Sequence, residues 1–289
     1  MKRIAILGCE NSHADAFVKF IKEKEEFRDV EVVGVYSDDP AASEKLKEKF
    51  GVPVMNGYAD ALGNIDGLVI TARHGDNHYK YAKPYIDSGI PMFIDKPITI
   101  SEEEAVEFMG RLKEKGVRIS GGSSLKQDAF VRQLKEEGEQ DAGGKTVGGY
   151  VRAPYQSENE YGGFFFYAQH LVEMVCEIFG RFPRSVIAKQ KGQQIHVLFR
   201  YQDYDCVGLF CDKSNFYYAS RMAETTASGS PIPFTYDWYY REFKEFYQLL
   251  SGNPQTAPYE EFISPVFVMN AIVRSLEQGT EEPIHPISL

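Results

Sequence analysis

The first 122 residues alternate short apolar runs with amphipathic segments, and this alternation limits the possible folds more than any other feature of the chain. The apolar runs are continuous and β-branched, as in strands covered on both faces, and they lie at 3–8, 30–37, 67–72, 91–95 and 117–122. Segments with helical periodicity separate them, at 14–25, 41–50, 77–88 and 102–115. Regular alternation of strands and helices predicts a parallel, doubly wound α/β sheet, whose carboxyl edge is the place where such sheets bind ligands.

Beyond residue 122 the pattern changes. A polar, glycine-containing link at 136–145 precedes strand-like runs with few helices between them, which is typical of an antiparallel sheet. Helical segments accompany these runs at 165–179, 236–250 and 260–278. We therefore predict two domains, which a chain of 289 residues is long enough to form. The first is a doubly wound domain over 1–122, and the second is an α+β domain with a largely antiparallel sheet over 123–289.

The charge and the cysteine content argue against several classes of function. A net charge of −10 is unsuited to a nucleic acid or an anionic membrane as partner, because both require clustered Lys and Arg side chains. No apolar run approaches the ~20 residues of a membrane-spanning helix, and the start of the chain lacks the pattern of a signal peptide. The four cysteines have no C-x-x-C spacing, so we predict no metal site and a cytoplasmic location with reduced thiols.

The tripeptide Asp95-Lys96-Pro97 follows the apolar run at 91–95, where a parallel strand would end at the ligand-binding edge. Pro97 favours an extended backbone at Lys96. A lysine that is partly withdrawn from water at this place is able to pass a proton to or from a substrate hydroxyl. The alternative is an ordinary surface lysine that follows a strand.

These motifs, in their order along the chain, resemble those of the glucose–fructose oxidoreductase / inositol dehydrogenase (Gfo/Idh/MocA) family. The similar segments are the turn after the first strand and the stretches 37–53, 69–97, 162–174 and 271–284. The resemblance implies an amino-terminal Rossmann domain that binds NAD or NADP, and a carboxyl-terminal α/β domain. It also implies a small-molecule substrate, a sugar, cyclitol or related polyol, and a homo-oligomer (dimer or tetramer) that associates through the carboxyl-terminal sheet.

The resemblance assigns the role of catalytic lysine to Lys96, because residues 95–97 match the family's Glu-Lys-Pro tripeptide. His170 matches the histidine of the family's Asp-x-x-x-His pattern, but Phe166 stands in the place of the aspartate. Glu173 lies three residues after His170, within reach of the same helix face, so we hypothesise that Glu173 orients the imidazole. The alternative for His170 is a core position in an apolar helix.

The turn after the first strand departs from the glycine-rich pattern that holds a dinucleotide. Gly8 provides the tight turn, but Glu10 stands where a second glycine lets the backbone approach the pyrophosphate. His13 stands where a third glycine lets helix and strand pack closely. Three explanations are open: Glu10 turns to solvent, the cofactor sits differently, or no cofactor binds. Asn11, Ser12 and His13 would supply cofactor contacts that glycines lack.

The choice between NAD and NADP is expected to depend on the end of the second strand, where an acid hydrogen-bonds the 2′-hydroxyl of the adenosine ribose. Ser37 takes the family position and Asp38 follows it; Asp38 would repel a 2′-phosphate, which favours NAD without excluding NADP. The resemblance places further cofactor contacts at Thr71, Arg73, His78, Asp95, Lys96 and Pro97. For Arg73 the alternative is a solvated loop.

Substrate contacts are predicted at Lys96, Lys126, Tyr155, Tyr167 and His170, with the two tyrosines as surfaces for stacking on a sugar. Two functions are compatible with this set. The first is an NAD(P)-dependent oxidoreductase that transfers a hydride between nicotinamide and a carbinol or ketone of a polyol, with Lys96 and His170 as acid/base groups. The second is a catalytically degenerate relative that binds a ligand or regulates, which the altered glycine turn and the missing aspartate support. We favour the enzyme because Lys96 and His170 are both present.

Overall fold

The computed structural model describes residues 1–289, apart from the side chain of Asp212. The chain divides into two compact units. The first unit comprises Met1–Gly122, Tyr236–Phe262 and Leu289, and the second comprises Ser123–Thr235 and Ile263–Ser288. The predicted division into 1–122 and 123–289 therefore needs a correction, because Tyr236–Phe262 belongs to the first unit.

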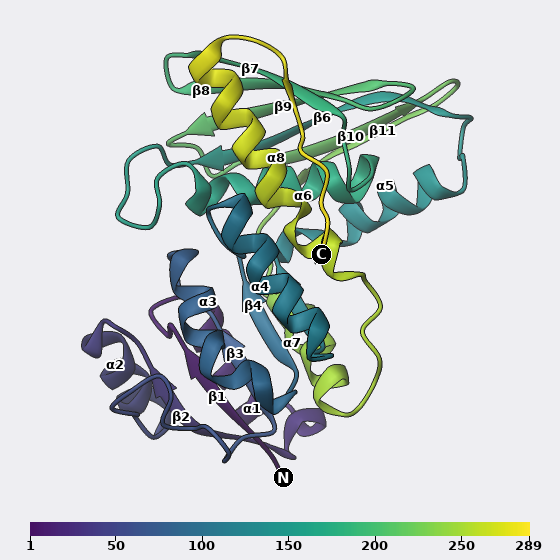
Figure 1. Cartoon of the computed structure of the whole chain (residues 1–289). Coiled ribbons are helices and arrows are strands. Elements are labelled where there is room, and N and C mark those ends of the chain that lie inside the picture. Colours follow the sequence, from purple (N-terminus) through teal and green to yellow (C-terminus); the bar gives the residue numbers. More distant parts are fainter. The chain divides into compact units, whose positions relative to one another are not determined.

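The first unit is built on a five-stranded parallel sheet with the order β2-β1-β3-β4-β5 (Figure 1). Its strands match the predicted apolar runs: β1 (Lys2–Leu7), β2 (Val30–Tyr36), β3 (Gly67–Ile70), β4 (Met92–Asp95) and β5 (Ile119–Gly122). The crossovers contain α1 (Ser12–Glu23), α2 (Pro40–Phe50), α3 (Asp76–Ala82) and α4 (Glu102–Glu114). The order of strands reverses between β1 and β3, so the loops after these two strands border the crevice where doubly wound folds bind ligands.

Helix α7 (Asp237–Leu250) returns to this unit and packs against α1 and β5. The ring centroid of Phe243 lies 5.1 Å from that of Phe17 and 4.9 Å from that of Phe27. Burial of these aromatic rings holds the returning segment on the first unit, because each ring removes a large apolar area from water. The periodicity of the sequence predicts this helix, but it does not reveal which sheet the helix accompanies.

The second unit contains a seven-stranded sheet with the order β11-β10-β6-β9-β8-β7-β12. Neighbouring strands run antiparallel except β6 and β9, which pair in parallel. The strands are β6 (Thr146–Tyr155), β7 (Ser185–Lys191), β8 (Gln194–Arg200), β9 (Asp205–Asp212), β10 (Tyr217–Ala223), β11 (Ala227–Ile232) and β12 (Glu282–Pro283). This sheet, together with the parallel sheet of the first unit, confirms the predicted fold class.

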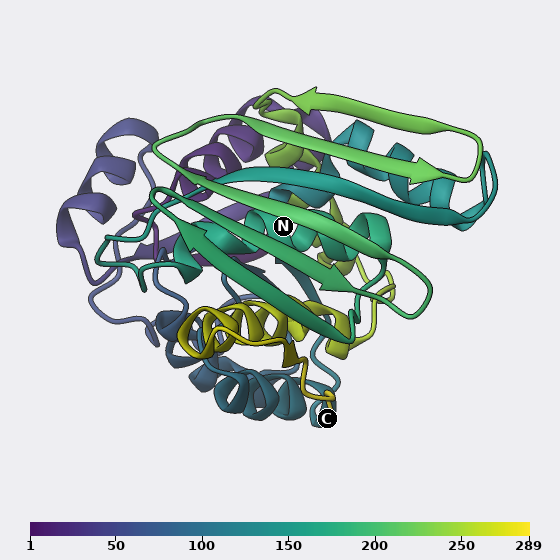
Figure 2. The same cartoon turned by 90° about the horizontal axis from the view of Figure 1, so that it is seen from above.

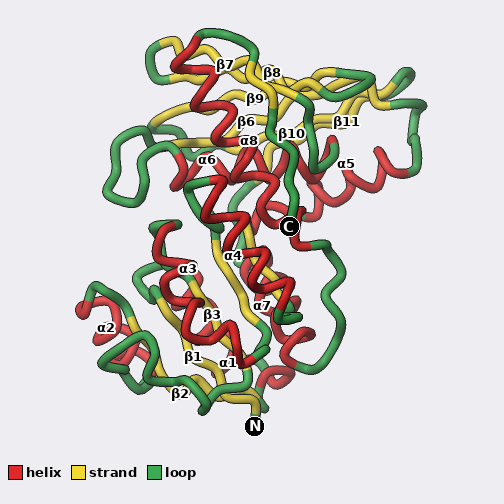
Figure 3. Tube along the Cα trace, in the orientation of Figure 1, coloured by secondary structure: helices red, strands yellow, loops and turns green.

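Helices cover one face of the second sheet (Figure 2). Helix α6 (Phe165–Phe179) packs on β6 and β9, and α5 (Ala129–Glu139) packs on β10 and β11; Figure 3 separates these helices from the strands by colour. Successive side chains of a strand point to opposite faces of the sheet, so one set faces the helices and the other set faces away from them. Phe210 of β9 is buried on the helix side, whereas Val207 of β9 and Met222 of β10 are exposed on the opposite face. Helix α8 (Tyr259–Gln278) precedes β12, and its Ser275 hydroxyl accepts a 2.9 Å hydrogen bond from the Ala188 N–H of β7.

Two further features are not found among the described residues. No helix in this part of the chain has the length and apolarity needed to cross a membrane. Nor do the described His, Cys, Asp and Glu side chains form a group of three that would hold a metal ion.

Candidate functional site

The loop after β1 approaches the loop after β3 so closely that position 8 requires glycine. Gly8 has a φ of +73°, and a Cβ built on it would lie 2.4 Å from the Ala72 Cα atom. Thr71 is fully buried, and its hydroxyl donates to the Gly8 carbonyl at 3.0 Å. The predicted cofactor contact of Thr71 is thus corrected to a structural role, because its hydroxyl fixes the turn at Gly8.

Glu10 connects the loops that follow β1, β2 and β3. Its Oε2 accepts a hydrogen bond from the Ser37 hydroxyl at 2.7 Å, and its Oε1 accepts one from the Arg73 backbone N–H at 3.0 Å. The Ser37 oxygen in turn accepts a hydrogen bond from the Asp39 N–H at 3.0 Å. Of the three explanations for Glu10, the structure excludes the first, in which the side chain turns to solvent. The carboxylate instead lies at the switch point of the sheet.

Asp38 is bound by side chains from β2 and α3. Its Oδ1 accepts a hydrogen bond from the Tyr36 hydroxyl and its Oδ2 one from the Lys80 ammonium, both at 2.8 Å. Partial burial opposes ionisation of Asp38, but the contacts with Lys80 and Tyr36 outweigh it and hold the pKa of Asp38 below its ordinary value. Both carboxylate oxygens therefore have a partner within the protein, and the Lys80 ammonium balances the charge of Asp38.

The residues after Glu10 converge on Asp95, which closes β4 and is fully buried. The Asn11 amide donates to Asp95 Oδ2 at 2.7 Å, while the Asn11 carbonyl oxygen accepts from the Ser12 N–H at 2.7 Å and so caps α1. His13 Nδ1 lies 3.1 Å from the same Oδ2, and the Lys96 N–H donates to Asp95 Oδ1 at 2.7 Å. Asn11, His13 and Asp95 therefore contact one another, and the predicted cofactor contacts of the buried His13 and Asp95 are corrected to this inward role.

A residue that the sequence did not single out completes this cluster. Glu242 of α7 is buried, and its Oε2 lies 3.2 Å from His13 Nε2. We call His13, Asp95 and Glu242 the His13 cluster. Glu242 was missed because its helix was assigned to the second domain. A signal was nevertheless present: Glu242 stands between Trp238 and Phe246 at helical spacing, so it shares their buried face.

The His13 cluster brings three ionisable groups together out of water. The two ring nitrogens of His13 lie 3.1 and 3.2 Å from carboxylate oxygens of Asp95 and Glu242. Burial lowers the pKa of His13, and burial raises the pKa of Asp95 to about 6 despite the opposing effect of His13. Burial thus disfavours the charged form of both His13 and Asp95.

Lys96 directly follows Asp95 and is only 4% exposed. Burial lowers the pKa of Lys96 to about 8; the Asp95 charge opposes this shift, and the Arg73 charge adds to it. A part of the Lys96 population is therefore neutral near pH 7, which an acid/base group for a hydroxyl requires. Arg73, predicted as a cofactor contact, is placed by this charge effect in the neighbourhood of Lys96.

His78, predicted as a cofactor contact, is fully buried. Its Nε2 lies 2.8 Å from the Ala72 carbonyl oxygen and its Nδ1 3.3 Å from that of Ile98. Burial lowers the pKa of His78 to about 4, so the ring is neutral at pH 7. The structure corrects the prediction: His78 braces the loop after β3 against the segment that follows Lys96. Pro97 lies in the same packed region, where a Cβ on Gly75 would approach its Cγ to 3.0 Å.

His170 lies on α6 in the second unit and is 8% exposed. Its Nδ1 lies 2.7 Å from the Ser123 hydroxyl, at the residue that follows β5. The Glu173 carboxylate is bound instead by the Gln169 amide at 3.0 Å and by the Arg181 guanidinium at 2.5 Å. The hypothesis that Glu173 orients His170 is wrong, and Ser123 has this role. The sequence feature that could have indicated Ser123 is the pair of serines, Ser123 and Ser124, directly after the apolar run at 117–122.

The other predicted substrate residues of the second unit differ in their surroundings. The ring of Tyr167 lies 5.5 Å from that of His170, so Tyr167 belongs to the same neighbourhood. Lys126 lies in the 3₁₀ turn Ser124–Gln127, which packs on α6. Tyr155 is buried in the core between Phe164 and Phe210, with ring centroids at 6.2 and 6.0 Å. The prediction that Tyr155 stacks on a sugar is therefore corrected to a packing role.

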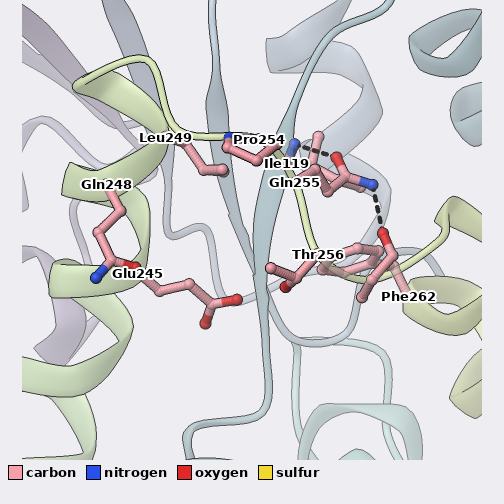
Figure 4. A pocket seen from close by; sticks show the side chains of 9 residues that line it. Ile119, Glu245, Gln248, Leu249, Pro254, Gln255, Thr256 and Phe262 are labelled. Atoms are coloured by element: carbon pink, nitrogen blue, oxygen red, sulfur yellow. Dashed lines mark hydrogen bonds between the residues drawn. The ribbon is translucent and has the colours of Figure 1, made fainter.

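A small pocket of the first unit lies away from these groups (Figure 4). Its lining includes Ile119 at the start of β5 and Leu249 near the end of α7. The Gln255 side chain crosses it, accepting from the Ile119 N–H and donating to the Ala257 carbonyl, both at 2.7 Å. Because Ile119 opens its strand, the pocket lies at the amino edge of the parallel sheet, opposite to the edge that carries Lys96.

Residues 2–123 match the model of an oxidoreductase family with an NAD-binding Rossmann fold, GFO_IDH_MocA. The chain carries a Gfo/Idh/MocA-family Rossmann domain. This finding confirms the resemblance and the predicted class, an oxidoreductase family whose Rossmann domain is of the NAD-binding type. The uncharacterized oxidoreductase YhhX of Escherichia coli is a curated relative with 25% identity over 122 residues. The match covers 39% of this chain and only 35% of the relative, so it spans little more than a third of that protein.

Solved structures resemble the chain over nearly its whole length. A myo-inositol dehydrogenase from Corynebacterium glutamicum has a TM-score of 0.85 and 16% identity, with 99% of each chain covered. A scyllo-inositol dehydrogenase from Lactobacillus casei, solved with NAD(H) and scyllo-inositol, has a TM-score of 0.85 and 14% identity. That match covers 98% of this chain and 99% of the other. At these identities the likeness shows the fold alone, and the chemistry has to be argued from the site.

Proposed function

We propose that this protein is an NAD-dependent dehydrogenase that oxidises a carbinol of a cyclitol or a related polyol, or reduces the corresponding ketone. The observation that carries the proposal is the state of Lys96. This lysine is buried at the carboxyl end of β4, on the edge that carries the switch-point loops, and its pKa is lowered to about 8. A lysine in this state is able to exchange a proton with a substrate hydroxyl near neutral pH.

The residues of the switch point fit a dinucleotide in their chemistry. Helix α1 begins at Ser12, directly after the β1 loop, and the amino end of such a helix favours an anionic pyrophosphate. Glu10 and Ser37 place acceptor oxygens beside the end of β2, where a nucleotide ribose carries hydroxyl donors. Arg73 adds a positive charge near Lys96. When bound, NAD would supply the hydride acceptor, and the protein would supply orientation and the path of the proton.

Lys96 handles the proton of the reaction. Its amine takes the hydroxyl proton when the carbinol is oxidised and returns a proton when the ketone is reduced. Asp95 holds the backbone of Lys96 through the 2.7 Å bond from the Lys96 N–H. A polyol without phosphate groups suits a chain with a net charge of −10, and the dehydrogenases of similar fold are named for inositols.

The first test is nucleotide binding, measured by calorimetry on the full chain with NAD(H) and NADP(H). A screen of inositols and sugars then follows NADH absorbance. We expect NAD to bind and one class of polyol to be oxidised. If the protein binds neither nucleotide, the proposal fails.

A ligand-binding relative without catalysis is the second candidate. The observation that favours it is the closed network behind the β1 loop, in which Asn11 and His13 contact Asp95. This candidate predicts that a polyol raises the melting temperature while NAD(H) does not. A thermal-shift experiment with NAD(H) and with the polyols therefore separates the two candidates.

A homo-oligomer through the sheet of the second unit remains part of the proposal. The face opposite α5 and α6 carries apolar side chains, among them Val207 at 39% and Met222 at 47% exposure. A second copy of the chain would cover such a face, because exposed apolar patches mark association surfaces. We expect light scattering to give a dimer or tetramer for the native chain and a smaller species for Val207→Lys. A native monomer would contradict this part of the proposal.

A further inference from the structure

The carboxylate of Glu10 lies where a Rossmann domain binds the adenosine end of its cofactor. It belongs to the loop after β1, yet it reaches the Ser37 hydroxyl at the end of β2 at 2.7 Å and the Arg73 N–H after β3 at 3.0 Å. The order of strands reverses at this point of the sheet. Doubly wound folds place an acid beside the end of the second strand to bond the ribose hydroxyls. In this chain two acids are present there: Asp38, which follows β2, and Glu10, which reaches the same place from the β1 loop.

The side chains at the end of β2 are committed to other partners. The Ser37 hydroxyl donates a hydrogen bond to Glu10, and its oxygen accepts one from the Asp39 N–H at 3.0 Å. The two oxygens of Asp38 accept from Tyr36 and Lys80, both at 2.8 Å. A ribose at this end of the sheet would therefore meet an Asp38 that is ion-paired with Lys80, and a Glu10 that accepts from two neutral groups, the Ser37 hydroxyl and the Arg73 N–H.

The geometry points to Glu10 as the residue that bonds the adenosine ribose hydroxyls of the cofactor and thereby selects NAD over NADP. This inference rests on the proposed function, since it assumes a nucleotide at the switch point. A carboxylate offers about four acceptor positions on its two oxygens. Ser37 and Arg73 use two of them in the structure, and the 2′- and 3′-hydroxyls of a ribose are two donors.

The same carboxylate disfavours NADP for an electrostatic reason. A 2′-phosphate carries negative charge and lacks the hydroxyl that would donate to Glu10. Like charges ~4 Å apart near a protein surface weaken binding by about a hundredfold or more. The Glu10→Gln variant keeps the length of the side chain and removes its charge. It therefore separates the charge of Glu10 from the space that the side chain fills.

The experiment measures dissociation constants by calorimetry on the native full-length chain and on Glu10→Gln. The ligands are NAD, NADP, ADP-ribose and 2′-phospho-ADP-ribose. We expect the preference for NAD over NADP to fall by about tenfold to a hundredfold in Glu10→Gln, through weaker NAD binding and stronger NADP binding. The two ADP-ribose ligands should show the same change, which locates the effect at the adenosine end. Glu44→Gln, on the surface of α2, removes the same charge elsewhere and should leave the preference unchanged.

Several results would overturn the inference. The first is an unchanged preference for NAD over NADP in Glu10→Gln. The second is an equal loss of affinity for all four ligands, which would mean that Glu10 only holds the neighbouring loops together. The third is a change of preference in Asp38→Asn and none in Glu10→Gln. If Glu10→Gln does not fold, Glu10→Ser is measured in the same way. A native chain that binds no nucleotide fails the proposed function and this inference together, whereas the other results fail the inference alone.

Discussion

The β1 loop of the first unit and helix α6 of the second unit both differ from the pattern that the resemblance implies, and their polar groups find partners of different kinds. In the β1 loop, Glu10 and His13 replace glycines, and each brings an ionisable group that other polar groups of the same unit surround. In α6, Phe166 replaces an aspartate, and the neutral hydroxyl of Ser123 takes the place of the missing partner of His170. His13 thus lies beside two carboxylates, whereas His170 has the neutral hydroxyl of Ser123 beside its Nδ1.

This difference teaches how sensitive each region should be to mutation and to pH. Removing one partner from a buried charged cluster leaves the other charge without compensation, at a cost of about 3–5 kcal/mol. Removing one neutral hydrogen bond costs about 1 kcal/mol. We therefore expect large effects on stability and on proton transfer in the first unit, and a smaller effect on orientation in the second.

The largest effect is expected from Lys96→Met. Loss of the acid/base group should lower kcat by about a hundredfold to ten-thousandfold, with NAD affinity retained. Native oxidation should accelerate as the pH rises through about 8, because the neutral amine of Lys96 is the base. Steady-state kinetics with the polyol found in the screen measure both, and Lys83→Met, on the surface, is the control. Native-like turnover in Lys96→Met would remove this residue from the mechanism.

The next largest effect is expected from breaking the His13 cluster. Glu242→Ala should lower the free energy of unfolding by about 3–5 kcal/mol, because it leaves the His13 imidazole buried beside an empty site. A double-mutant cycle with His13→Ala should show a coupling of about 1–3 kcal/mol. Urea unfolding measures these values, and Gln248→Ala on the exposed side of α7 is the control. Additive effects of the two substitutions would mean that the cluster does not act as a unit.

A third prediction concerns pH and the second buried imidazole of the first unit. The pKa of His78 is lowered to about 4, so the unfolded chain binds a proton at this residue before the folded chain does. This contribution to stability is fully present above pH ~6.5 and is lost as the pH falls through about 4, at a cost of about 3 kcal/mol. Urea unfolding between pH 7 and 4 should therefore show a shallower decline for His78→Gln than for the native chain. His196→Gln on the surface of β8 should keep the native slope; equal slopes for all three proteins would contradict the prediction.

The smallest effect is expected from Ser123→Ala in the second unit. If His170 takes part in the reaction, loss of its 2.7 Å partner should lower kcat by about tenfold and shift the pH–rate profile, with little change in KM. Ser123→Thr, which keeps the hydroxyl, should restore the rate. A native rate and profile in Ser123→Ala would leave His170 with a packing role only.

Much of the fold and part of the site could be predicted from the sequence. The five parallel strands, the helices between them and the place of Lys96 at a strand end follow from local periodicity. Strand β11 could not be predicted, because its small and polar residues, with Gly229 and Pro231, lack the apolar signal of a strand. Tyr155, Thr71 and His78 were assigned to the ligand side because the sequence gives no measure of which polar groups are buried.

The sequence by itself determined the two classes of sheet, the turn at Gly8 and the position of Lys96, because these depend on residues that are neighbours in the chain. The tertiary structure alone decided the partners of the polar groups. Asn11 meets Asp95 across 84 positions and Ser123 meets His170 across 47, while Glu242 reaches His13 because α7 packs on α1. The physical reason is that a buried polar group has to find its partner wherever the chain brings one, and that place is set by packing rather than by sequence spacing.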